Sequence, residues 1–188
     1  VAHIDLSRPF STKGLVFGSN HHLPSEIRLL SADLAPAGFH ARFSAAAKEY
    51  SYRIRPGRFV PPDLKPFVLA VPDRLDLERL QAATLLLPGR HDFSCCALAG
   101  GSHRSPIRPL FRAAWEQESG ALTLRIAGDG FLRGMVRSLV GTLLEVALGQ
   151  RSLASFTALL TGGERGTAGP TAPAHALTLE RIDYPPHT

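Results

Sequence analysis

Strands are predicted along this chain wherever apolar side chains take every second position, or gather in short runs between turn residues. The segments that meet this pattern are 1–6, 26–35, 49–55, 107–117, 121–128 and 176–184. Ser119 and Gly120 separate two of them, and this short polar link is typical of a hairpin turn. A proline-rich stretch from Pro56 to Pro66 predicts an irregular loop.

Helices are predicted where apolar side chains recur every three to four residues. Ser11 is a candidate N-cap for a helix to about Asn20, and a leucine-rich helix follows over 73–89. The longest helix covers about 130–148, and a shorter one lies near 153–161. The core-facing stripe of the longest helix is Leu132, Met135, Val136, Leu139, Leu143 and Val146. These elements predict an α+β fold of ferredoxin-like type, with an antiparallel or mixed sheet and helices on one face.

A second face of the longest helix carries small residues, including Gly134, Ser138 and Gly141. Glycine inside a helix costs about 0.5–1 kcal/mol relative to alanine, so this face indicates close approach by another backbone or by a nucleic acid. Arg137 lies beside it. The residue is either a solvated arginine whose stem covers the helix or one held against a carboxylate or phosphate.

Charge adds a possible partner to this picture. The net charge is +5 with an isoelectric point near 9.8, which suits a polyanion such as nucleic acid, although many basic proteins bind none. Arg104, Arg108 and Arg112 follow two glycines, a composition that fits phosphate contact and equally an ordinary surface loop.

The sequence gives little support for a metal site, a membrane span or a signal peptide. The adjacent Cys95 and Cys96, and the histidines, lack the spacing of metal ligands, so no metal site is expected. No apolar run has membrane-spanning length, and the first ten residues do not read as a signal peptide, which favours a cytoplasmic protein. Because the chain opens in mid-strand at Val1, we expect a fragment or a processed product.

Five motifs, in order, resemble those of the tRNA pseudouridine synthase A family, which isomerises uridines in the anticodon stem-loop of tRNA. They are NHHLPSEI (20–27), FHARFSAAAKEYSYRI (39–54), GRHDFSCCA (89–97), GDGFLRGMVRSLVGTLLEV (128–146) and AGPTAPAHALTLERIDY (168–184). The chain departs from the family pattern at Cys96, Asp129, Arg133, Gly134 and Ala176.

The resemblance implies roles for particular residues. Tyr50 would stack on the flipped uracil and could remove its C5 proton, while Arg137 would pair with the catalytic aspartate. The residues expected to contact RNA are His40, Arg42, Phe43, Lys48, Arg104, Arg108 and Arg133. The implied reaction needs no cofactor, and the implied assembly is a homodimer whose clefts combine both subunits.

The family's nucleophilic aspartate lies in a G-R-T-D-A-G-V-H-A element, which these 188 residues do not contain. Asp5, Asp33, Asp92 and Asp129 do not lie in such a context, and the nucleophile is assigned to none of them. We expect residues 1–40 to be the remainder of an N-terminal domain, and 41–188 a C-terminal α+β domain with Tyr50 and Arg137. The alternatives to an isomerase are a non-catalytic RNA-binding module of this fold and, more distantly, a metal or small-molecule enzyme.

Overall fold

The computed structural model describes residues 1–101, 104–118, 120–164 and 166–185. Contacts divide the chain into two compact units. Unit 1 is Val1–Ala45 with the residues from Tyr184 onward, and unit 2 is Ala46–Asp183. The boundary in contacts thus falls at Ala45, and the assignment of 1–40 and 41–188 to two domains stays a prediction.

Unit 1 contains the helix α1 (Thr12–His22) and extended segments. The predicted cap is confirmed, because the Ser11 hydroxyl accepts a hydrogen bond from the Gly14 N–H at 3.3 Å. The strands predicted over 1–6 and 26–35 are wrong: both segments have the alternation, but neither is paired within the described part of unit 1. A strand requires a hydrogen-bonded neighbour, and alternation alone does not supply one.

Unit 2 is built on a mixed sheet of six strands. The strands are β1 (Ala47–Pro56), β2 (Leu69–Val71), β3 (Gly89–Asp92), β4 (Ile107–Glu118), β5 (Ala121–Gly128) and β6 (Leu177–Asp183). Their order is β2-β1-β5-β4-β3, and β6 pairs with the first part of β1. The predicted hairpin of β4 and β5 is confirmed as an antiparallel pair, while the short β2 and β3 had no sequence pattern to predict them.

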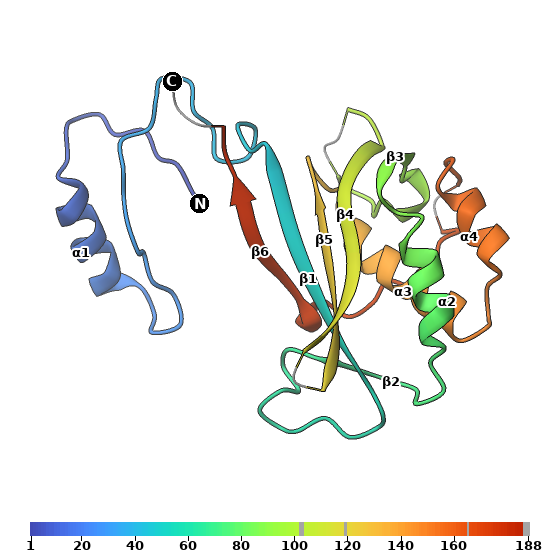
Figure 1. Cartoon of the computed structure of the whole chain (residues 1–188). Coiled ribbons are helices and arrows are strands. Elements are labelled where there is room, and N and C mark those ends of the chain that lie inside the picture. Colours follow the sequence, from blue (N-terminus) through green and yellow to red (C-terminus); the bar gives the residue numbers. More distant parts are fainter. Residues whose placement is uncertain (102–103, 119, 165, 186–188) are drawn as a thin grey trace. The chain divides into compact units, whose positions relative to one another are not determined.

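Three helices cover one face of this sheet: α2 (Leu77–Thr84), α3 (Met135–Ala147) and α4 (Leu153–Leu159), as Figure 1 shows. Helix α3 begins later than predicted because Gly134 takes a left-handed conformation, with φ 76°, at its N-cap. Helix α2 is shorter than the predicted 73–89, since it begins at Leu77 and the backbone tightens into turns after Thr84. Two short turns of 3-10 helix lie at Ser94–Cys96 and Ala174–Ala176.

The hydrophobic core lies between the sheet and the helices. All six residues of the stripe predicted on α3 are buried, none more than 4% exposed. They face Tyr52, Ile54, Leu124 and Ile126, each 0% exposed, from β1 and β5. The predicted α+β fold, with a mixed sheet and helices on one face, is confirmed.

Candidate active site

Tyr50 stands on the central strand of the sheet. Its backbone pairs with Ile126 of β5 on one side and with Leu179 of β6 on the other, so both neighbours fix its position. Side chains alternate along a strand, which directs Tyr50 to the same face as the buried Tyr52. Tyr50 itself is only half-buried, and this burial raises the pKa of its phenol. The site therefore offers a neutral aromatic ring at the edge of the core.

Phe131 is a neighbour of Tyr50 that the sequence reasoning did not single out. Its ring meets that of Tyr50 edge to face, with centroids 5.1 Å apart and planes at 83°. It comes from the loop that joins β5 to α3. The only signal in the sequence was its place in the fourth motif, where it reads as one more apolar residue.

Arg137 lies in the first turn of α3 and is half-buried. Its Nε donates to the Ala172 carbonyl at 2.6 Å, and the Ala172 N–H donates back to the Arg137 carbonyl at 3.1 Å. Among the described residues, no carboxylate forms an ion pair with this guanidinium. The side chain is thus held by the protein, and its two Nη groups are directed by that hold.

The charge of Arg137 also acts on the tyrosine face of β1. Burial raises the pKa of Tyr52 to about 12, and the nearby Arg137 guanidinium offsets part of this rise by favouring the phenolate. Tyr52 is two residues from Tyr50 on the same face. The arginine and both tyrosines therefore belong to one region, where the start of α3 meets β1.

The small-residue face of α3 packs against residues 167–173, here called the strap. The Gly169 N–H donates to the Thr142 hydroxyl at 2.9 Å. A Cβ placed on Gly141 would lie only 1.7 Å from the Pro170 carbonyl oxygen. Another backbone, and not a nucleic acid, therefore accounts for the glycine at this position.

Two of the arginines expected to contact RNA lie near the start of α3. The Leu98 N–H donates to the Arg133 carbonyl at 2.8 Å, and Arg133 donates through Nη1 to the Ala99 carbonyl at 3.1 Å. Arg108 is half-buried and donates to the Ile107 carbonyl at 2.7 Å. Arg104 is exposed and precedes β4. Leu98 and Ala99 thus bond the segment that carries Phe131 and leads into α3.

His40, Arg42 and Phe43 belong to unit 1, where they form a tight turn. The His40 Nδ1 accepts from the Arg42 N–H at 3.1 Å, which fixes this nitrogen as an acceptor. The Arg42 guanidinium carbon lies 5.5 Å from the centre of the Phe43 ring, and Phe43 is 75% exposed. Lys48, by contrast, belongs to unit 2 and is half-buried on β1.

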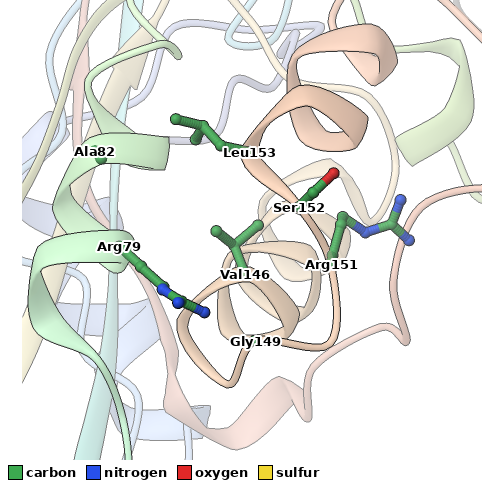
Figure 2. Close-up of a pocket in the computed structure, with 7 residues that line it drawn as sticks. All are labelled: Arg79, Ala82, Val146, Gly149, Arg151, Ser152 and Leu153. Carbon is green, nitrogen blue, oxygen red and sulfur yellow. The ribbon is translucent and has the colours of Figure 1, made fainter.

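A pocket of about 340 Å³ lies near the other end of α3, against α2 and the start of α4 (Figure 2). Arg79 and Arg151 line it, and both are in ion pairs, with Asp76 at 3.2 Å and with Glu145 at 2.8 Å. Val146 contributes an apolar wall. Both cations are paired, and the Ser152 hydroxyl in the lining caps α4 by accepting from the Ser155 N–H at 3.1 Å, so we do not place the chemistry here.

The two cysteines lie together in the core. Cys95 and Cys96 are buried with their Sγ atoms 3.6 Å apart. In the ranges that the structure describes, no group of three or more His, Cys, Asp or Glu side chains is arranged to hold a metal ion. Within the same ranges, every helix is too short or too polar to cross a membrane.

Comparisons with known proteins identify the family. The model of a family described as tRNA pseudouridine synthase matches residues 82–185. The "tRNA pseudouridine synthase A" of Shouchella clausii is 37% identical over 98% of this chain and 70% of its own length. The proteins of the same name from Chloroflexus aurantiacus and Syntrophotalea carbinolica are 37% and 38% identical, each over 99% of this chain and over 68% and 74% of their own lengths. These matches do not favour the non-catalytic RNA-binding module, and the chain belongs to the tRNA pseudouridine synthase family of isomerases.

Proposed function

We propose that this chain supplies the tyrosine and the arginine of an enzyme that converts uridine to pseudouridine in the anticodon stem-loop of tRNA. One observation carries the proposal: Arg137 is half-buried, held at Nε by the Ala172 carbonyl, and has no carboxylate partner in the described ranges. A half-buried cation without a counter-ion favours binding of an anionic group. The charge also reaches the face of β1 that bears Tyr50.

The reaction breaks the bond between N1 of uracil and C1′ of the ribose, and forms a bond from C5 to C1′. The C5 proton is lost and N1 gains one, so the reaction is an isomerisation and needs no cofactor. In the mechanism that the resemblance implies, an aspartate attacks the flipped nucleotide before uracil turns and rejoins. In the family that aspartate belongs to the G-R-T-D-A-G-V-H-A element, which these 188 residues do not contain.

Tyr50 fits the stacking role in this scheme. Its ring is fixed by β1 and by Phe131, and stacking of a base on an aromatic ring is worth about 1–3 kcal/mol. The raised pKa keeps the phenol neutral near pH 7, which fits stacking better than removal of the C5 proton. Arg137 would use its Nη groups to hold and polarise the aspartate, since Nε is already engaged.

The proposed contacts to RNA combine basic side chains, which would bind phosphates, with aromatic rings. Arg104, Arg108 and Arg133 would bind phosphates near the start of α3, and Lys48 would do so beside Tyr50. His40, Arg42 and Phe43, which belong to unit 1, would also contact RNA. We further propose a homodimer, as the resemblance implies, and a cytoplasmic site of action, where tRNA is used.

The test maps pseudouridine in tRNA after incubation with this chain and with a form extended upstream through an aspartate element. We expect product with the extended form alone. Arg137→Lys in that form keeps the charge but loses the planar fork, and should lower the rate by at least about 100-fold. Absence of product from both forms, with tRNA still bound, would return the non-catalytic binding module as the better hypothesis.

A further inference from the structure

Tyr52 is the most firmly held side chain near Arg137. Its backbone pairs with Leu124 on one side and with Leu177 on the other, and its side chain is 0% exposed. A tyrosine so deeply buried must satisfy its hydroxyl within the protein. It does so by donating to the Pro173 carbonyl at 2.8 Å.

This hydrogen bond reaches the residue next to the one that holds Arg137. The Ala172 carbonyl accepts from Arg137 Nε at 2.6 Å, and the Pro173 carbonyl accepts from Tyr52. Two consecutive carbonyls at the end of the strap thus accept hydrogen bonds, one from α3 and one from β1. Because Leu177 pairs with Tyr52 in the ladder, β1 also holds the chain a few residues beyond the strap.

The strap needs such an anchor because it has no regular structure of its own. Over 167–173 it forms neither helix nor strand, and it follows α3 by contacts at Thr142 and Gly141. Only its last residues lie beside Arg137, where the reciprocal bonds with Ala172 are made. The direction of the Ala172 carbonyl, and with it the guanidinium, therefore depends on how Pro173 is fixed.

We propose that Tyr52 is a positioning residue: its hydroxyl fixes the end of the strap so that the Ala172 carbonyl orients the guanidinium of Arg137. The effect on catalysis rests on the function proposed above, whereas the coupling between Tyr52 and Arg137 does not. The competing explanation is that the Tyr52 hydroxyl is merely satisfied by the nearest carbonyl, with no effect on the arginine. The pKa of Tyr52, raised to about 12, keeps the phenol protonated, and hence a donor, at neutral pH.

The experiment follows the exchange of the Arg137 Nε–H with water by heteronuclear NMR on the full chain. The signal is assigned by its loss in Arg137→Lys. Tyr52→Phe keeps the ring and removes one hydroxyl, and should accelerate the exchange by about 2- to 10-fold, the factor expected for one neutral hydrogen bond. Tyr184→Phe is the matched control, because it removes a hydroxyl that donates to the Ala41 carbonyl at 2.7 Å in unit 1. It should leave the exchange unchanged.

An unchanged rate in a folded Tyr52→Phe protein would overturn the proposal, as would an equal change in the Tyr184→Phe control. If Tyr52→Phe does not fold, replacement of the chain's three tyrosines by fluorotyrosine keeps each hydroxyl and makes it a stronger donor. Exchange of the Arg137 Nε–H should then be slower, and no change would again overturn the proposal.

The functional arm uses the extended form. Tyr52→Phe should lower kcat for pseudouridine formation and leave KM for tRNA unchanged. A poorly oriented Arg137 guanidinium affects the chemical step and not the binding of tRNA. A changed exchange rate without any pseudouridine from the extended form would support the coupling while overturning the proposed function. The two failures are therefore distinguishable.

Discussion

Two tyrosines that are neighbours on one face of β1 differ in burial and in the contacts that they make. Tyr52 is fully buried and its hydroxyl is bonded within the protein, whereas Tyr50 is half-buried and meets Phe131 edge to face. The alternation over 49–55 puts both tyrosines on one face of the predicted strand, and the family motif singled out Tyr50. Neither the alternation nor the motif reveals the bond from Tyr52 to the strap, because that contact joins residues far apart in the chain.

Phe131 should control the environment of Tyr50. Phe131→Leu removes an aromatic edge from the Tyr50 ring, admits water, and should therefore lower the pKa of Tyr50 toward its ordinary value. The titration is followed by NMR with isotope-labelled tyrosine. Phe59→Leu, at a side chain that is 73% exposed in a loop, is the control and should leave the pKa unchanged. An equal pKa in Phe131→Leu and the parent chain would show that Phe131 does not shield the ring.

Tyr52 should make stability fall at alkaline pH. Its folded pKa, about 12, lies above the unfolded value, so folding favours the protonated phenol. The contribution is complete below about pH 10, the ordinary tyrosine pKa, and is lost as the pH rises toward the folded value. Urea denaturation at about pH 9 and about pH 11.5 should show this loss, and Tyr52→Phe should reduce it. An equal alkaline loss in both proteins would assign the effect to other groups.

Among the elements, α3 shows what sequence patterns do and do not predict. Its core stripe followed directly from helical spacing, and all six residues are buried. Its start did not, because only the positive φ of Gly134 reveals that this glycine caps the helix instead of lying inside it. The small-residue face indicated a close neighbour, but the identity of that neighbour, the strap, depends on tertiary packing.

Gly141→Ala should destabilise the protein although alanine is the better helix former. The gain in helix propensity is about 1 kcal/mol, but the added Cβ would lie 1.7 Å from the Pro170 carbonyl oxygen, so the strap must move. Overpacking of this kind costs about 1–3 kcal/mol or more, and we expect a net loss in the free energy of unfolding.

The matched control is Gly18→Ala in α1, where no atom lies within 4 Å of the added Cβ. That change should stabilise α1 or leave it unaltered, by up to about 1 kcal/mol. Chemical denaturation followed by circular dichroism measures both. A Gly141→Ala protein as stable as its parent would mean that the strap yields without cost.

At the scale of the whole molecule, the family and the α+β class were open to sequence reasoning, but the state of unit 1 was not. Its segments 1–6 and 26–35 alternate like strands, yet they form no strand pair with any described residue, and Leu30 and Leu34 are 90% and 91% exposed. Pairing depends on which other segments are present to supply hydrogen bonds. A local pattern cannot report this. In unit 2 the four predicted strands find partners within the unit, and only the short β2 and β3 were missed.

Binding of tRNA should depend on the arginines near the start of α3 in a way that salt reveals. Arg108→Gln and Arg133→Gln should each weaken binding and lower the slope of log affinity against log salt by about 0.7–1, the value for one lost phosphate contact. Arg112→Gln is the control, since Arg112 is paired with Glu116 on the same strand and should contribute less. Filter binding across a salt series measures all three.

The pattern of slopes distinguishes a phosphate contact from a structural role. Arg133 also bonds the Ala99 carbonyl, so its loss could weaken binding by loosening the loop. A loosened loop would reduce affinity by a similar factor at every salt concentration, because no counter-ions are released differently. Parallel lines for Arg133→Gln and the parent chain would therefore remove Arg133 from the RNA-binding set, and a shallower line would keep it there.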